Sequence, residues 1–259
     1  MPQAAMSPAD IQRRKARNRK IVIGFFAFIG VVVVLESPLA RVRSFQVSGN
    51  TTIPAQRIIA ESGLHKGQSL WQVNRGNVAH HVTSKEPMIQ SVAVSTDWVK
   101  GSIDLTVRER QVVAVYETSG KFYQLLNNGV VYQEAAPKDG LPYPLVTASQ
   151  SHVKLGQAVS PEVTAVCKQL AKVDSGVLTD VSEFHVNGDG TVSLYLDNQF
   201  VVTCDTKGLV GSFNAMHSAV QYFIEKGYKP GNIDLSGAPP YLYTPFSNTS
   251  AGANEKGAQ

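Results

Sequence analysis

The chain has 259 residues, of which 43% are hydrophobic and 17% charged, a composition typical of a folded protein. Its net charge of +4 is unevenly placed: six of the 24 basic residues lie between Arg13 and Lys20, and one of the 20 acids, Asp10, precedes them. The rest of the chain then holds 18 basic and 19 acidic residues. Nucleic-acid binding needs a basic folded face, so this composition argues against it.

An uncharged run of fifteen residues, "IVIGFFAFIGVVVVL", begins at Ile21. A membrane-spanning helix needs about 20 apolar residues, and the following positions extend the run to that length. We expect a transmembrane helix over residues 21–42, with residues 1–20 as a disordered basic tail in the cytoplasm and the rest of the chain outside it. The alternative is a signal peptide cut after Ala40, which Pro38 disfavours because it breaks the small-x-small pattern.

Residues 45–110 show a mixed pattern of strands and helices. "FQVSG" alternates like a half-buried strand, and Thr52 is placed to cap a helix with Pro54 in its first turn. A second helix is expected over residues 74–83, with Asn74 as its cap. "MIQSVAVST" and "SIDLTVRER" alternate like two further strands. The predicted order is β-α-α-β-β.

Residues 111–246 are dominated by predicted strands. Ser119-Gly120 joins the first two as a tight turn, and "VSEFHVN", "GDGTVSLYLDN" and "QFVVTCD" form a three-strand meander. Two amphipathic helices accompany them, one capped by Ser160 and one beginning near Ser212. The fold class is therefore α+β, with a mostly antiparallel β domain flanked by two helices, and residues 247–259 are expected to be a disordered tail.

The sequence offers little that points to catalysis. Cys167 and Cys204 are either a disulfide or two buried thiols, and the high apolar content favours thiols. The six histidines lack metal-ligand spacing, and a triad of Cys204, Asp205 and His217 has no flanking signature. We therefore predict no catalytic residue, no metal and no cofactor.

The last predicted strand is the feature that most suggests binding. It includes Ile233–Leu235 and Tyr241–Tyr243, and a terminal strand is often the edge of a sheet, open to a strand from another chain. Tyr241 and Tyr243 point to one face, and either anchor a partner or cover the end of the core.

Three motifs now carry a resemblance that covers nearly the whole chain. They are Val47-Ser48-Gly49-Asn50, Val107-Arg108-Glu109-Arg110 and Ile233-Asp234-Leu235. Together with the basic tail and apolar run, they resemble the bacterial cell-division family FtsQ/DivIB. The resemblance implies a POTRA domain over residues 45–110 and a β domain over residues 111–246.

The resemblance also implies a function, that of a membrane-anchored scaffold at the division septum without enzymatic activity. Its expected partners are FtsL and FtsB/DivIC-type proteins, bound by strand addition at the C-terminal edge, with further division proteins bound through the POTRA domain. The family's contact region matches Ile233, Leu235, Tyr241, Leu242 and Tyr243, so a charge at Tyr243 or a proline at Leu242 is expected to abolish binding while the domain stays folded. The alternatives are an extracytoplasmic enzyme acting on the cell wall and a POTRA-type secretion chaperone.

Overall fold

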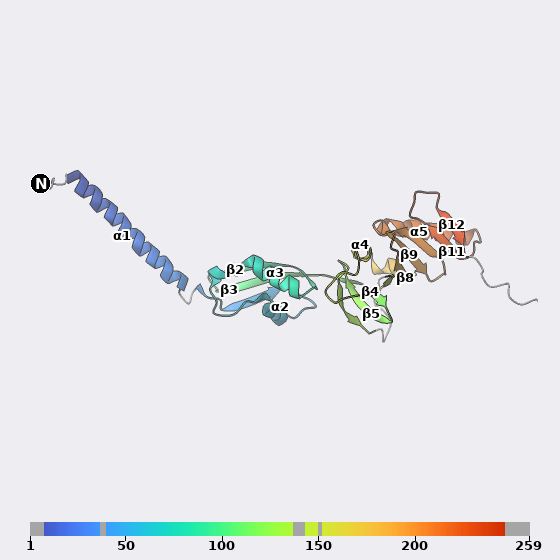
Figure 1. The fold of residues 1–259 in the computed structure, drawn as a ribbon, viewed down its shortest axis with the longest axis horizontal. Coiled ribbons are helices and arrows are strands. Elements are labelled where there is room, and N and C mark those ends of the chain that lie inside the picture. The colour runs from blue at the N-terminus through green and yellow to red at the C-terminus, as the bar shows by residue number, and fades with distance from the viewer. Residues whose placement is uncertain (1–7, 37–39, 137–142, 150–151, 247–259) are drawn as a thin grey trace, which may run out of the picture. The chain divides into compact units, whose positions relative to one another are not determined.

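The computed structural model describes residues 8–36, 40–136, 143–149 and 152–246. The expected C-terminal tail, residues 247–259, lies outside this range. The chain divides into two compact units, with the boundary between Glu109 and Arg110 (Figure 1).

The first helix, α1 (Pro8–Glu36), is longer at its start and shorter at its end than the sequence pattern predicts. The expected disorder of residues 8–20 is wrong, because this stretch is rich in Ala, Arg, Lys and Gln, which favour helix. Helix α1 also stops before residue 42, where the predicted span ends. Val42 belongs instead to the next domain, where it is buried and its N–H donates to the Gln68 carbonyl (2.9 Å).

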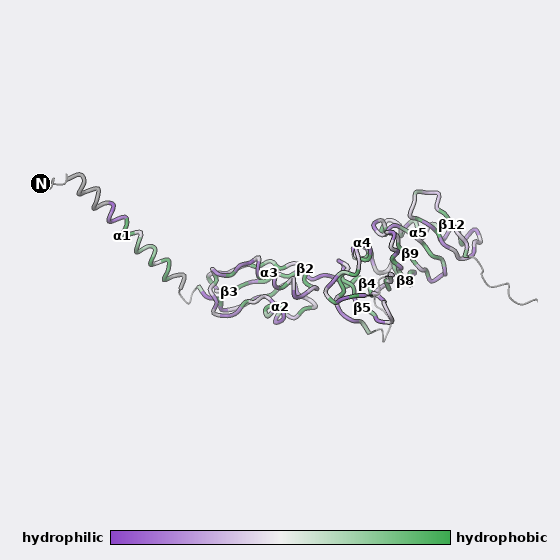
Figure 2. The backbone as a smooth tube through the Cα atoms, in the orientation of Figure 1, coloured by the Kyte–Doolittle hydropathy of each residue, from purple (hydrophilic) through white to green (hydrophobic). Residues whose placement is uncertain are grey.

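From Ile21 to Val33, α1 carries only apolar residues and glycine (Figure 2). Its exposed side chains include Phe25, Phe26 and Phe28, each more than half accessible. Within the described ranges, no helix has both the length and the apolar content that crossing a membrane takes.

The rest of the first unit has the predicted β-α-α-β-β order, and a short 3-10 turn, η2, precedes its second helix. Its sheet has the order β1-β3-β2, with β1 parallel and β2 antiparallel to β3. The elements are β1 (Ser44–Ser48), α2 (Ala55–Ser62), η2 (Leu70–Gln72), α3 (Arg75–Lys85), β2 (Ile89–Asp97) and β3 (Ser102–Glu109). Ile103, Leu105 and Val107 of the central strand are all buried, as are Ile58 and Val82 of the helices, so the core lies between sheet and helices.

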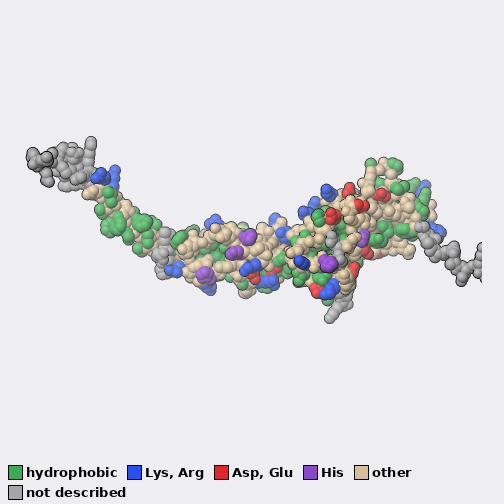
Figure 3. Space-filling model, in the orientation of Figure 1, with side chains coloured by type: hydrophobic (Ala, Val, Ile, Leu, Met, Phe, Trp, Pro, Cys, Tyr) green, Lys and Arg blue, Asp and Glu red, His purple; other side chains and the backbone are tan. Residues whose placement is uncertain are grey.

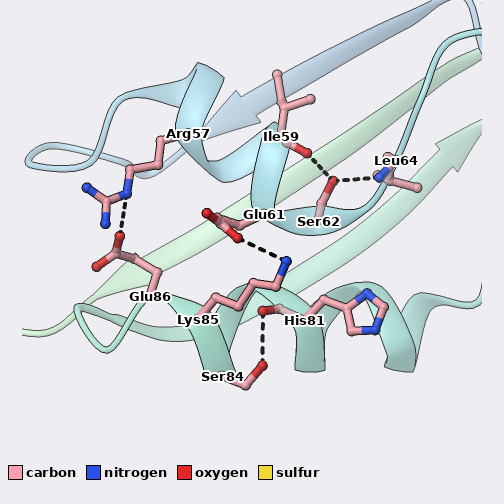
Figure 4. A network of polar contacts seen from close by, with 9 residues as sticks. All are labelled: Arg57, Ile59, Glu61, Ser62, Leu64, His81, Ser84, Lys85 and Glu86. Atoms are coloured by element: carbon pink, nitrogen blue, oxygen red, sulfur yellow. Dashed lines mark hydrogen bonds and ion pairs between the residues drawn. The ribbon is translucent and has the colours of Figure 1, made fainter. Parts of the chain in front are cut away.

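Two ion pairs also join α2 to α3 and to Glu86, the residue that follows α3 (Figure 4). Arg57 Nε lies 2.8 Å from a carboxylate oxygen of Glu86, whose side chain is almost fully buried. Lys85 and Glu61 pair at 3.1 Å. Because removing Arg57 would leave a buried carboxylate without a cation, the first pair matters more for stability than the second, exposed one.

Two residues of the sequence motifs, Gly49 and Glu109, connect the segment after β1 to the end of β3. Gly49 has φ +80°, and a Cβ there would lie 2.2 Å from the Val107 carbonyl oxygen, so only glycine fits. The Glu109 carboxylate accepts hydrogen bonds from the N–H groups of Thr51, Thr52 and Ile53 at 2.8–3.0 Å and from the Thr51 hydroxyl at 2.7 Å. The predicted Thr52 cap is therefore wrong: its N–H bonds Glu109, and α2 begins without a side-chain cap.

The second unit is built on one nine-stranded sheet with the order β12-β11-β10-β9-β8-β7-β4-β5-β6. Most neighbours are antiparallel, as predicted, but β4 with β7, β7 with β8, and β10 with β11 are parallel. The strands are β4 (Val112–Thr118), β5 (Lys121–Leu126), β6 (Val131–Ala135), β7 (Leu145–Ala148), β8 (Val181–Val186), β9 (Thr191–Leu196), β10 (Val201–Asp205), β11 (Gly231–Asp234) and β12 (Leu242–Pro245).

The helices of this unit are α4 (Pro161–Leu170), the short η3 (Ser175–Leu178) and α5 (Leu209–Glu225). Their buried residues share one core with alternate residues of the strands, including Phe184 on β8, which meets Phe213 of α5 edge to face. Ser160 caps α4 as predicted, accepting from the Val163 N–H (3.1 Å). Both amphipathic helices thus bury their apolar faces against the sheet.

Candidate functional site

Strand β12 lies at one end of the nine-stranded sheet and pairs only with β11 among the described strands. Its other side therefore presents backbone N–H and C=O groups that no strand of the described chain takes up. The free stretch is short, because Pro245 at its end has no N–H to donate. A strand added here gains a few backbone hydrogen bonds and must draw further affinity from side chains.

The two faces of β12 differ in what surrounds them. Tyr243 pairs with Ile233, whose side chain is fully buried, so both point to the core face. Leu242 points to the opposite face and is 65% exposed. Phe246, just after the strand, is 50% exposed. The edge therefore carries an exposed apolar pair, Leu242 and Phe246.

Tyr243 holds β12 onto its own domain. Its ring stacks on Phe223 of α5 (4.9 Å between centroids) and meets Tyr228 edge to face (5.0 Å). Its hydroxyl donates to the Lys229 carbonyl (2.7 Å). A Cβ on Gly231 would lie 2.7 Å from the ring, so the glycine makes room for it. Of the two readings open for this tyrosine, the structure supports the one in which it covers the end of the core.

Ile233 and Leu235 lie behind the edge rather than on it. Ile233 belongs to β11, which has β10 on one side and β12 on the other, and it is fully buried. Leu235 is 8% exposed, and its N–H donates to the Thr203 carbonyl (2.7 Å). The predicted site treated these residues and the tyrosines as one strand, whereas Ile233 lies in β11, Tyr243 lies in β12, and Leu235 and Tyr241 lie in the connection between the two strands. Both leucine and isoleucine therefore support the edge from the core.

Tyr241 is partly buried against the same core, so of the predicted site residues Leu242 is the most exposed. Sequence reasoning missed Phe246, although Leu242, Thr244 and Phe246 alternate in a way that places all three on one face of a strand. On the helix side, Tyr222, Ile224 and Tyr228 are also exposed near the end of α5 and just beyond it.

The imagined triad around Cys204 is not formed. Cys204 points into the core, and burial raises the pKa of its thiol to about 11, so it is not a nucleophile at neutral pH. His217 lies on the exposed side of α5. Cys167 is a second free, buried thiol, whose pKa burial raises to about 12. In the part of the chain that the structure describes, no group of three His, Cys, Asp or Glu residues is placed to hold a metal.

A pocket of about 550 Å³ lies in the first unit, between the loop after α2 and the start of α3. Arg41, His65, Trp71 and His81 are among its lining residues, which include no Asp, Glu or Cys. The lining therefore lacks the paired carboxylates by which most glycoside hydrolases act.

Comparison with known families decides the class of the protein. Residues 40–110 match the model of the FtsQ-type POTRA domain, and residues 114–236 match that of the C-terminal domain of cell division protein FtsQ/DivIB. The chain belongs to the FtsQ/DivIB family. Gly49 and Glu109, which close the first unit, both fall in the POTRA match, whereas β12 follows the end of the C-terminal match.

Two relatives found by sequence agree with the FtsQ/DivIB assignment. Cell division protein DivIB of Geobacillus kaustophilus is 33% identical over 178 residues, which cover 67% of this chain but less than two thirds (64%) of that relative. DivIB of Bacillus subtilis is 22% identical over 205 residues, covering 76% of this chain and 73% of the relative. The solved major extracytoplasmic domain of DivIB from Geobacillus stearothermophilus aligns with a TM-score of 0.33 and 20% identity, covering 47% of this chain and 98% of that domain.

Proposed function

We propose that this chain is a membrane-anchored, non-enzymatic scaffold of the bacterial division machinery. In this proposal it holds FtsL and FtsB/DivIC-type partners at the septum by accepting a strand at the β12 edge. Membership of a family of cell division proteins supports the setting, and the free side of β12 supports the mechanism.

The membrane anchor in this proposal is the apolar part of α1 with the residues that follow it. The side chains from Ile21 to Val33 are apolar or glycine on every side of the helix and are exposed. A helix that is hydrophobic all round needs an apolar environment, and a bilayer provides one. The basic residues between Arg13 and Lys20 then stay in the cytoplasm, which leaves both folded units outside it.

The observation that carries the proposed mechanism is the open side of β12. Backbone pairing there supplies register, and the exposed Leu242 and Phe246 supply apolar contact for a partner's side chains. A partner with its own membrane anchor is confined to the same surface. Confinement raises its effective concentration, so a short edge suffices for binding.

The test is a titration of the full chain in detergent with the extracytoplasmic segment of a DivIC-type partner. Leu242→Asp places a charge on the exposed face of the edge, where it needs no repacking of the core. We expect affinity to fall at least about tenfold, because an interface anchor of this kind contributes more than about 1.4 kcal/mol.

The matched control is Leu155→Asp. Leu155 is 62% exposed, close to the 65% of Leu242, and its neighbour Gly156 bonds the Val131 carbonyl of β6 at the opposite end of the sheet. The same change in the same unit should leave affinity unchanged. Equal affinities for the Leu242→Asp variant and the unaltered chain would refute binding at β12.

A further inference from the structure

The turn between β2 and β3 exposes an unusual pair of apolar side chains. Trp98 is 52% exposed and Val99 is 88% exposed, at a position where turns ordinarily hold Gly, Asn, Asp or Ser. Neither residue packs into the core between the sheet and the two helices. An apolar pair held in water at a turn suggests a surface that meets something other than water.

This turn is held in one shape. The Asp97 carboxylate accepts hydrogen bonds from the N–H groups of Val99 (2.9 Å) and Lys100 (3.0 Å), and Gly101 completes the turn at φ +64°. The Lys100 ammonium lies 3.6 Å from the same carboxylate. The Asp97 side chain therefore holds the turn in place, and the turn presents Trp98 and Val99 outward at little further cost in conformational entropy.

The topology puts this turn at the end of the unit where the chain arrives from α1. Because β1 runs parallel to β3 and Ser44 pairs with Ser102, the start of β3 lies beside the start of β1 (Figure 1). The Arg43 N–H donates to the Gly101 carbonyl (2.8 Å), which ties the turn to the arriving chain. Between Glu36, the last residue of α1, and Ala40 the chain spans at most about 14 Å.

Basic side chains surround the same place. Arg41 and Arg43 precede β1, Lys100 lies in the turn, and Lys66 lies in the loop whose Gly67 carbonyl accepts from the Arg41 guanidinium (3.1 Å). Figure 3 shows basic and apolar side chains at this end of the unit. Asp97 is the one acid of the turn, and Lys100 faces it. The local excess of charge is positive.

We propose that this membrane-contact tip, made of Trp98, Val99, Lys100, Arg41 and Arg43, rests on the surface of the bilayer and contacts anionic lipid headgroups. Tryptophan favours the boundary between headgroups and acyl chains, and arginine and lysine favour lipid phosphates. The inference rests on the proposed anchoring of α1, which brings the bilayer within reach of the tip. Unlike β12, this tip is a turn, so backbone strand pairing does not add to the contacts of its two apolar side chains, and basic residues surround it; an anionic lipid surface is therefore the occupant that fits.

The chain contains two tryptophans, so Trp71→Phe leaves Trp98 as the sole reporter. The full-length Trp71→Phe chain is reconstituted into vesicles of phosphatidylcholine with about a quarter phosphatidylglycerol, where the anionic lipid mimics a bacterial surface. Lipids brominated near the headgroup end of the acyl chain quench a tryptophan that lies at the boundary. We expect blue-shifted Trp98 emission that these lipids quench, and weaker quenching in pure phosphatidylcholine.

Two variants separate lipid contact from simple proximity. Val99→Asp and Arg43→Glu should each reduce the quenching, since one removes the apolar tip and the other a headgroup contact. Arg108→Glu is the control, because Arg108 is an exposed arginine at the far end of the same strand β3, about 20 Å along it. It should leave the quenching unchanged.

Flotation of the vesicles after an alkaline wash reports the anchor separately. A chain that floats with the vesicles while Trp98 stays unquenched overturns the membrane-contact tip and leaves the anchor standing. A chain that does not float overturns the anchor and, with it, the tip. If Trp98 is quenched equally with and without phosphatidylglycerol, the proposed contact of the basic residues with anionic headgroups is contradicted.

Discussion

Replacing Glu109 by glutamine should destabilise the POTRA unit in a pH-dependent way. Partial burial of this carboxylate by itself raises its pKa, but hydrogen bonds from the Ile53 N–H, the Thr51 hydroxyl and N–H, and the Thr52 N–H outweigh burial and bring the pKa down to about 2. In the unfolded chain the pKa returns to its usual 4.5. Folding therefore stabilises the ionised form of the Glu109 carboxylate relative to its protonated form.

The size of the effect follows from this difference. A pKa lowered by this much corresponds to about 3 kcal/mol at most, and solvent screening of a partly exposed group reduces that to about 1–2 kcal/mol. Because the folded pKa is depressed, the stabilisation is fully present above pH 4.5 and is lost as the pH falls toward 2. The Glu109→Gln variant should thus be about 1–2 kcal/mol less stable than the unaltered chain at neutral pH. This difference in the free energy of unfolding should shrink as the pH falls toward 2.

The assay is urea unfolding of the full chain followed by tryptophan emission. Trp71 and Trp98 both lie in the first unit, so the signal reports that unit alone. Glu61→Gln is the control, since Glu61 forms a partly exposed pair with Lys85 that contributes less than about 1 kcal/mol. Equal stability of the Glu109→Gln and unaltered chains at neutral pH, or a difference that persists undiminished at pH 2, would refute the reasoning.

Three further outcomes follow from the packing. Gly49→Ala should cost at least about 2 kcal/mol in urea unfolding of the first unit, because its Cβ meets the Val107 carbonyl at 2.2 Å; a cost near zero would contradict that geometry. Tyr243→Phe should cost about 1 kcal/mol in the second unit by losing its bond to the Lys229 carbonyl, which circular dichroism in urea would detect. Cys167 should react with a maleimide only after unfolding, since its pKa is raised to about 12; rapid labelling of the native chain would count against its burial.

Local patterns predicted the elements of this fold well. Asn74 caps α3 as its spacing indicates, accepting from the Asn77 N–H (3.1 Å), because a cap depends on residues three apart. The Ser119-Gly120 turn has positive φ at both residues, 53° and 74°, as a tight hairpin turn requires. These features are decided within a few residues, so periodicity and turn chemistry suffice to find them.

Features that join distant segments escaped the same reasoning. The bonds from Glu109 to Thr51 and Ile53 cross more than fifty positions of sequence, and no local pattern links their ends. The separation of Ile233 and Tyr243 into neighbouring strands likewise depends on how β11 enters the sheet beside β10. Tertiary pairing therefore decided which predicted site residues face solvent, and it left Leu242 exposed and Tyr243 packed.

Because Tyr243 is packed, a charged substitution there is no longer a clean test of partner binding. A charge at Tyr243 would disturb its stacking on Phe223 and its contact with Gly231, so it would weaken β12 itself. Loss of binding in such a variant could not be assigned to the interface. The exposed Leu242 separates the two effects, because its side chain contributes little to the core.

Amide hydrogen exchange of the full chain, with and without the extracytoplasmic segment of a DivIC-type partner, tests the central proposal most directly. If the partner adds a strand to β12, those amides of residues 242–244 that point away from β11 become protected on binding, while β6, the strand at the other end of the sheet, exchanges as before. Binding that leaves residues 242–244 unprotected and protects another surface would contradict strand addition at this edge.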